Sequence, residues 1–194
     1  MAAGLYSYRA SVAADSNYNA AGPADCEPLT VDKAQLTVTT TIHKADHTVV
    51  PNDGHVALGT VTHDNADVTG EVAGFPIGAI SFTLNAAGIA NGSTEAGFDA
   101  TSVSSAALAA GNYAYNATVA GNDNYLGDTS DQEPFVVDKA QLTVTTEVHD
   151  AQDVDITNDM VYQGSIVHDT ASVSGGVDGF TVPPPTFTLT SPYV

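Results

Sequence analysis

The string VDKAQLTVTT occupies residues 31–40 and recurs, letter for letter, at residues 137–146. The two copies lie 106 positions apart in a chain of 194 residues. The string holds no cysteine and no catalytic motif, so its repetition indicates a duplicated structural unit more than a duplicated site. A period of this length exceeds the periods of solenoids and fits an array of whole domains, each about the size of a small β-sandwich.

The repeat extends on both sides of this string. GLYSYRASVAADSNY (4–18) matches GNYAYNATVAGNDNY (111–125). HDNADVTGEVAGFPIGAISFTL (63–84) matches HDTASVSGGVDGFTVPPPTFTL (168–189). Only the stretch near 85–107 lacks a second copy.

Relative to this unit, the sequence predicts one complete domain and two partial ones. Residues 34–140 form the complete unit. Residues 1–33 match only its C-terminal strands, and residues 141–194 match only its N-terminal strands. We therefore expect that the sequence begins and ends inside a unit.

The local pattern of the unit is that of β-structure. Leu36, Val38 and Ile42 are interspersed with threonines at near period-two spacing, which is typical of half-buried strands. Turn residues separate such segments, and we expect HDNAD (63–67) to be one of the turns. Strands are predicted near 35–43, 55–62, 66–72, 78–84, 101–108, 112–120 and 133–138. This pattern predicts an all-β Greek-key sandwich.

The composition limits the partners. The chain has 23 acidic and 4 basic residues, a formal net charge of −19, which opposes binding to nucleic acid. Hydrophobic residues make up 43% of the chain, enough to form a core. No apolar run approaches the roughly 18 residues of a membrane span, so we expect no direct membrane insertion.

The motifs HDxAxVxGxVxGF, FTL, AGxYxYxAxVxxxxNY and EPxxVDKA resemble the tandem immunoglobulin-like repeats of large bacterial surface and adhesin proteins. The resemblance covers nearly the whole chain. It implies tandem immunoglobulin-like Greek-key sandwiches, one complete and two partial, in an extracellular or cell-surface protein. In that family the unit is typically a spacer that holds a distal domain away from the cell envelope.

The expected function is therefore structural and non-enzymatic, because no GxSxG motif or glycine-rich phosphate loop is present. The unit would act as a stalk or spacer between neighbouring repeats. It could instead be a fibre subunit, in which the partial end domains of identical subunits complete each other head to tail. The alternative is an adhesive module whose loops, such as 85–101, bind a carbohydrate or a protein. A host or surface glycan would then be bound there or by other parts of the parent protein.

Two features follow from the resemblance. LAAGNY (108–113) resembles the tyrosine corner of Greek-key sandwiches, in which the hydroxyl of a residue such as Tyr113 bonds to nearby backbone. The alternative is that Tyr113 is an ordinary core-facing strand residue. Cys26 occupies the place of a disulfide cysteine whose partner is absent from this chain, and the alternative is a buried free thiol. The complete unit has Gln132 at the equivalent position.

No cofactor is expected, with calcium as the alternative. Oxygen ligands suit Ca²⁺, and candidates near the domain ends are Asp15, Asn17, Asp123, Asp128 and Asp138. No DxDxDG loop supports them.

Histidines recur in both copies as His43 and His149, and as His63 and His168. Their spacing matches no zinc signature, so the HDxA motif is interpreted as a strand end followed by a turn and not as a metal site.

The repeated VDKA string is predicted to be a short joint between units. Its residues are Val31, Asp32, Lys33, Ala34, Val137, Asp138, Lys139 and Ala140.

Overall fold

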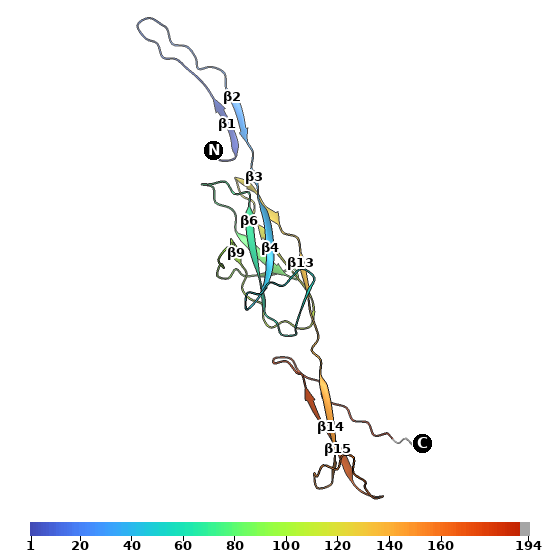
Figure 1. Cartoon of the computed structure of the whole chain (residues 1–194). Coiled ribbons are helices and arrows are strands. Elements are labelled where there is room, and N and C mark those ends of the chain that lie inside the picture. Colours follow the sequence, from blue (N-terminus) through green and yellow to red (C-terminus); the bar gives the residue numbers. More distant parts are fainter. Residues whose placement is uncertain (191–194) are drawn as a thin grey trace.

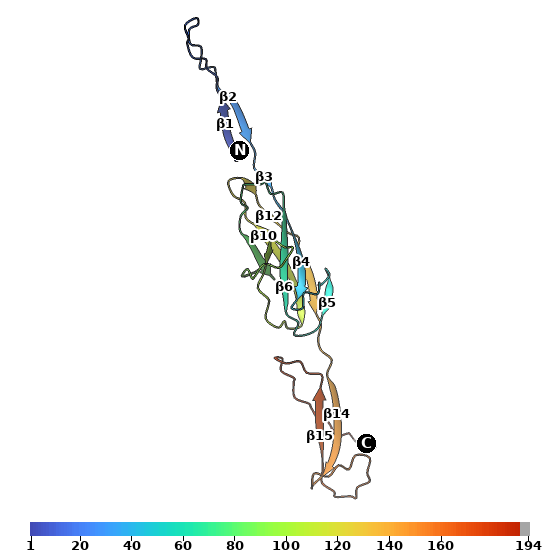
Figure 2. The ribbon, with the colours of Figure 1, turned by 60° about the vertical axis from the view of Figure 1, so that its left-hand side comes forward.

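The computed structural model describes residues 1–190, and these residues form an all-β protein with three parts in a line (Figures 1 and 2). A hairpin near the N-terminus is followed by a sandwich of two sheets and then by a second hairpin. None of the described residues forms a helix that could span a membrane.

The first sheet of the sandwich has β6 (Thr62–Thr69) between β4 (Thr37–Lys44) and the short β9 (Ala100–Thr101). Both pairings are antiparallel. The alternation predicted around Leu36, Val38 and Ile42 is confirmed, because all three side chains are buried while Thr37 and Thr39 are exposed.

The second sheet has the strand order β5-β13-β10-β7-β8. Its strands are β5 (Gly54–Val56), β7 (Ile80–Leu84), β8 (Ala87–Ile89), β10 (Gly111–Val119) and β13 (Glu133–Val137). The pair β5 and β13 is parallel, and the others are antiparallel. At the Val119 end of β10, the short strand β12 (Asp128–Thr129) pairs with β10. The short strands β3 (Ala34–Gln35) and β11 (Tyr125–Leu126) pair with each other in parallel.

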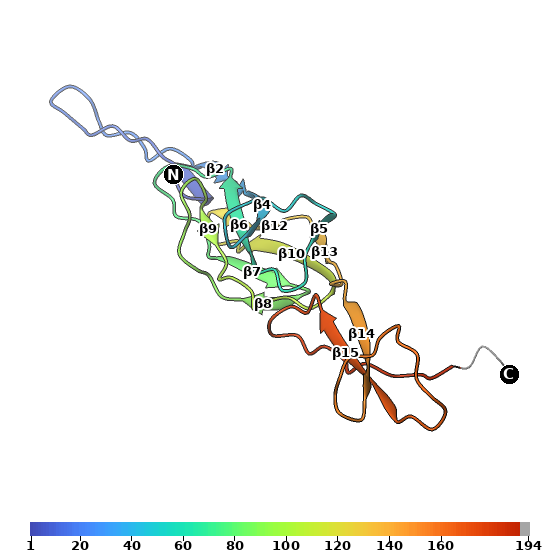
Figure 3. The same cartoon turned by 60° about the horizontal axis from the view of Figure 1, so that its bottom comes forward.

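The two sheets pack face to face around an apolar core, and Figure 3 shows β4 and β6 lying over β10. One cluster joins Val38 and Val68 of the first sheet to Phe82 and Val119 of the second. Another cluster joins Ile42 to residues of the second sheet that include Tyr115 and Phe135. The structure is therefore that of a β-sandwich.

The N-terminal hairpin copies two strands of the second sheet. Its strands β1 (Gly4–Tyr8) and β2 (Glu27–Val31) pair with Gly4 opposite Val31. In the sandwich, Gly111 of β10 lies opposite Val137 of β13 in the same register. The repeat in sequence is thus also a repeat in strand pairing.

The C-terminal hairpin copies two strands of the first sheet. Its strands β14 (Thr143–Asp150) and β15 (Val167–Ser174) pair with Thr143 opposite Ser174. The equivalent pair in the sandwich is Thr37 of β4 opposite Thr69 of β6. Each hairpin therefore corresponds to part of a different sheet of the sandwich.

The tyrosine corner expected at Tyr113 is present as a hydrogen bond. The hydroxyl of Tyr113 donates to the carbonyl of Ala109, four residues upstream, at 3.0 Å. In the N-terminal hairpin the hydroxyl of Tyr6 donates to the carbonyl of Ala2 at 2.8 Å. The same bond therefore recurs one repeat earlier.

Three of the local predictions were wrong. The strand predicted at 55–62 is not continuous, because β5 ends at Val56 and β6 begins at Thr62. HDNAD (63–67) lies inside β6 and is not a turn. Residues 102–108 do not form a strand after β9. Every third amide of this segment donates to every second carbonyl of the facing segment: Ser102 to Asp64, Ser105 to Thr62 and Leu108 to Thr60. One extra residue per step prevents a regular ladder.

Candidate metal centre

Two histidines face each other across the first sheet. His43 near the end of β4 lies opposite His63 near the start of β6, and their rings stack with centroids 5.7 Å apart. Their neighbours Ile42 and Asp64 occupy the opposite face of the sheet, because side chains alternate along a strand. His43 is 7% exposed and His63 is 4% exposed, so both imidazoles are more than nine-tenths buried.

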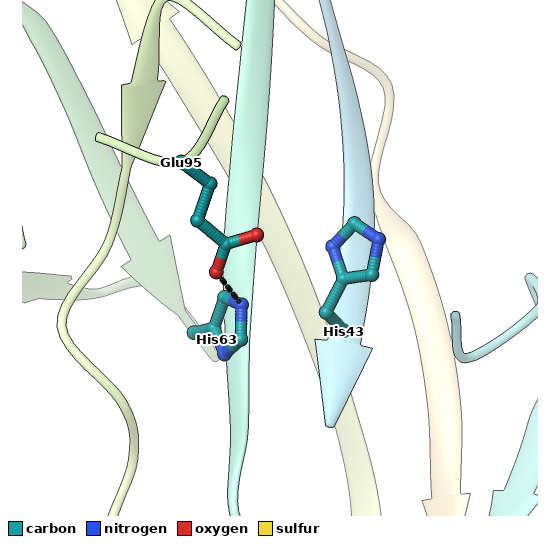
Figure 4. A group of neighbouring side chains, drawn as sticks. All are labelled: His43, His63 and Glu95. Atoms are coloured by element: carbon teal, nitrogen blue, oxygen red, sulfur yellow. Dashed lines mark ion pairs between the residues drawn. The ribbon is translucent and has the colours of Figure 1, made fainter. Parts of the chain in front are cut away.

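A loop between β8 and β9 covers the histidines and adds a carboxylate (Figure 4). Oε1 of Glu95 lies 2.6 Å from Nε2 of His63 and 2.9 Å from Nδ1 of His47, which belongs to the turn after β4. Asn65 of β6 donates to the other carboxylate oxygen of Glu95 at 2.9 Å. The loop is thus attached to the sheet through Glu95.

Nitrogen and oxygen ligands converge at this point. One ring nitrogen of His43, one of His63 and a carboxylate oxygen of Glu95 all lie within 4.8 Å of one another. Nδ1 of His43 is buried and has no hydrogen-bond partner among the described residues. Two imidazoles and one carboxylate are a ligand set that Zn²⁺ accepts.

The charge states suit metal binding. Burial lowers the pKa of His43, so this imidazole is neutral at pH 7. Burial alone would raise the pKa of Glu95, but the hydrogen bond from Asn65 and the nearby imidazoles of His63, His47 and His43 outweigh it and lower this pKa. A neutral imidazole and an ionised carboxylate are the forms that bind metal ions.

This cluster was not predicted from the sequence. His63-Asp64 was interpreted as a strand end and a turn, whereas both residues lie within β6. The candidate ligands come from three separate segments, so no short sequence motif with metal-ligand spacing indicates them. The only signal in the sequence was the recurrence of both histidines one repeat later.

The C-terminal hairpin repeats the histidine pair. His149 of β14 lies opposite His168 of β15, with ring centroids 5.6 Å apart. Asp153 stands where the sandwich has His47, and its carboxylate lies 3.3 Å from Nε2 of His168. Sheet pairing therefore reproduces the histidine geometry in both copies, whereas the segment that contains Glu95 has no counterpart in the C-terminal hairpin.

The five calcium candidates are spread over the molecule. Asp15 and Asn17 lie in the β1–β2 loop, where Oδ1 of Asp15 accepts the amides of Asn17 and Tyr18. Asp128 is next to the Val119 end of β10, and its carboxylate accepts the amide of Val38.

Asp123 is exposed in the β10–β11 loop, and Asp138 follows Val137 at the Gly111 end of β10. Among the described residues, no three of the proposed aspartates come together as a group that could share one ion. The calcium hypothesis therefore gains no assembled site and stays a prediction.

Cys26 is exposed and free. Its sulfur accepts a hydrogen bond from Nε of Arg9 at 3.0 Å. The alternative of a buried thiol was wrong, because the hairpin loop that holds Cys26 packs against no core.

The VDKA residues lie at the two joints between the three parts. At the first joint, Nζ of Lys33 donates to the carbonyl of Asn122 at 2.7 Å, and Ala34 begins β3. At the second joint, Asp138 follows the end of β13 and contacts Nδ1 of His55 at 2.8 Å. Lys139 and Ala140 line a cleft at this joint.

The buried Asp64 lies on the core face of the first sheet, near the half-buried Glu133 of β13 in the second sheet. Both carboxyl oxygens of Asp64 are buried without a hydrogen-bond partner among the described residues. Burial, reinforced by the nearby charge of Glu133, raises the pKa of Asp64 to about 8. Burial also raises the pKa of Glu133. Asp64 is therefore protonated at neutral pH.

No protein-family model, curated protein or solved structure matches this chain.

Proposed function

We propose that this chain is a structural repeat segment of a bacterial cell-surface or extracellular protein, built from tandem immunoglobulin-like units and acting as a stalk or spacer. The main support is that its two joints use equivalent residues. At the first joint, Ala3 and Ala34 line a cleft with Val72 and Phe75. At the second joint, Ala110 and Ala140 line a cleft with Val177 and Phe180, which are the counterparts of those residues one repeat later.

A single repeated joint is what a rod requires. When each unit meets the next through the same contacts, the rotation from unit to unit is constant and the array extends regularly. The second joint is closely packed at Gly59, whose backbone has φ of +84°, because a Cβ there would lie 3.1 Å from Cγ1 of Val177. The tyrosine-corner bonds of Tyr6 and Tyr113 further support the immunoglobulin-like assignment.

A second role, as a fibre subunit, is favoured by the apolar residues that the hairpins expose. Val12 and Leu29 of the N-terminal part are exposed, although their counterparts Val119 and Phe135 are buried in the sandwich. Val144, Val148 and Phe187 of the C-terminal part are likewise exposed, and their counterparts are Val38, Ile42 and Phe82.

These exposed residues have natural partners in a second copy. Val38 and Val119 belong to one core cluster, so their counterparts Val144 and Val12 would meet if the C-terminal hairpin of one copy received the N-terminal hairpin of another. Such a contact is head to tail and extends without closing.

The adhesive alternative has less support from the loop at 85–101. The ring of Phe98, its only aromatic residue, packs edge-on against His43 with centroids 5.7 Å apart. Phe98 is also half-buried, so less of its ring is exposed for stacking on a sugar.

Small-angle X-ray scattering tests the spacer role. The double variant Tyr8→Asp/Val148→Asp places a charge on the exposed apolar face of each hairpin and suppresses association. We expect a radius of gyration well above the roughly 16 Å of a compact 194-residue protein. A radius near the compact value would contradict an extended array.

A further inference from the structure

We propose that His43, His63 and Glu95 bind a Zn²⁺ ion, with His47 as the fourth ligand, and that the ion fastens the loop between β8 and β9 to the first sheet. This site belongs to the complete sandwich and does not depend on the role of the terminal hairpins. The site would have three imidazoles and one carboxylate as ligands, which fill all four positions around the ion as in structural zinc sites.

A buried nitrogen without a partner favours a metal ion at this cluster. Burying a polar nitrogen without a hydrogen bond costs free energy, and native structures leave few such atoms. His43 is 7% exposed, and its Nδ1 is unpartnered among the described residues. A metal ion at the centre of the cluster would supply the missing partner.

The distances between the candidate ligand atoms also favour a zinc site. Zinc–nitrogen bonds of about 2.0–2.1 Å imply ligand atoms about 3.4 Å apart around a tetrahedral ion. The Glu95 oxygen already lies 2.6 Å from Nε2 of His63 and 2.9 Å from Nδ1 of His47, and the atoms of the three-residue group lie within 4.8 Å. Small side-chain rotations therefore bring the ligand atoms of His43, His63 and Glu95 to the bound geometry, while the strand pairing of His43 and His63 stays as it is. The contact with Glu95 places His47 beside this group.

The chemistry of the ligands selects zinc over calcium and magnesium. Imidazole nitrogen suits Zn²⁺ and is a poor ligand for Ca²⁺ and Mg²⁺, which prefer oxygen. The net charge of −19 concentrates cations around the protein. His47 is exposed and Glu95 only partly buried, so an ion can enter from the side of the loop.

Isothermal titration of the full chain with ZnCl₂ after treatment with a chelator tests the site. A background with His149→Gln and His168→Gln removes the histidine pair of the C-terminal hairpin, so that one site remains. We expect one equivalent of Zn²⁺ to bind and the melting temperature to rise in zinc, and we expect CaCl₂ not to compete with zinc for this site.

Single variants in this background identify the ligands. Glu95→Gln keeps the shape and the hydrogen bond from Asn65, and we expect it to weaken zinc affinity by about 100-fold. His63→Gln should have a similar effect, and His47→Gln should weaken affinity by about tenfold. His55→Gln is the matched control, because His55 is an exposed imidazole of the same sandwich that contacts Asp138, and it should leave affinity unchanged.

Two results would overturn the proposal. One is the absence of zinc binding at millimolar concentration in the folded chain. The other is binding that both Glu95→Gln and His63→Gln leave unchanged. If His63→Gln does not fold, as judged by circular dichroism without metal, the result with Glu95→Gln decides alone.

Discussion

Tyr8 and Tyr115 occupy the same position in two copies of the repeat, but Tyr8 is 62% exposed whereas Tyr115 is fully buried. Tyr115 stacks with Phe135 and its hydroxyl donates to the carbonyl of Thr62 at 3.2 Å. Thr62 belongs to the first sheet, whose counterpart for Tyr8 is absent from the N-terminal hairpin. Burying a large apolar side chain contributes about 1.5–3 kcal/mol, so several such pairs give a strong drive to association.

The joint between the sandwich and the C-terminal hairpin should depend on Phe180. Replacing Phe180 with Ser removes an apolar ring from the cleft that Ala110 and Ala140 line. We expect a broader distribution of distances between spin labels on the two parts, in a Cys26→Ser background, because the joint loses its packing.

The melting temperature of the sandwich should change little in Phe180→Ser, because Phe180 belongs to neither of the two core clusters of the sandwich. Thr181→Ser, a conservative change at a neighbouring exposed residue, is the control. A distance distribution as narrow as that of the parent would show that the packed joint does not set the orientation.

The tyrosine corner should contribute to stability. Tyr113→Phe removes the hydroxyl that donates to Ala109, and we expect the free energy of unfolding to fall by about 0.5–1.5 kcal/mol. Urea denaturation measures this. Tyr162→Phe is the control, because Tyr162 is exposed and the change should have no measurable effect. Equal stability of parent and Tyr113→Phe would mean that the bond is replaced by water at no cost.

Stability should fall as the pH rises through neutrality. The pKa of Asp64 is about 8 in the fold because of burial, whereas an aspartate in an unfolded chain has a pKa of about 3.9. Between these values the folded state holds a proton that the unfolded state releases. The free energy of unfolding therefore decreases from about pH 4 to pH 8 and becomes flat above.

The variant Asp64→Asn isolates this effect from other titrations, including that of His43. We expect the difference in unfolding free energy between parent and variant to change by a few kcal/mol across this range. Chemical denaturation at several pH values in the presence of EDTA provides the measurement. Asp169→Asn, at the exposed counterpart in the C-terminal hairpin, should retain the parent's pH dependence. A parent and an Asp64→Asn variant with parallel pH profiles would refute the assignment.

Much of the fold could be predicted from the sequence, because the repeated segments of the chain can be aligned with one another. The strands at Thr37–Lys44, Ile80–Leu84, Gly111–Val119 and Glu133–Val137 are predicted to within about two residues by alternation and turn residues. The joint at VDKA follows from the repeat alone. The tyrosine corner follows from the resemblance and is confirmed by the bond to Ala109.

The polar interior could not be predicted in the same way. Thr62, His63, Asp64 and Asn65 are all buried, although HDN has the composition of a turn. Tertiary packing overrides this preference: the loop between β8 and β9 covers one face of β6, and the second sheet covers the other. The proposed metal site could not be predicted from the sequence for the same reason. Strand register places His43 opposite His63, and the loop between β8 and β9 brings Glu95 to both.

Head-to-tail completion of the two hairpins is the claim on which the fibre-subunit role rests. It is tested by mixing two variants that each keep one intact end. Tyr8→Asp disables the N-terminal hairpin, and Val148→Asp disables the C-terminal one. Leu5→Asp is the control, because Leu5 is exposed and its counterpart Asn112 is exposed in the sandwich as well.

Sedimentation velocity decides the question most directly. We predict that the parent and Leu5→Asp form a ladder of oligomers that lengthens with concentration. Each end-disabled variant alone should be a monomer, and their equimolar mixture should form dimers and nothing larger. A parent that stays monomeric at high concentration, or disabled variants that form the parent's ladder, would contradict head-to-tail completion.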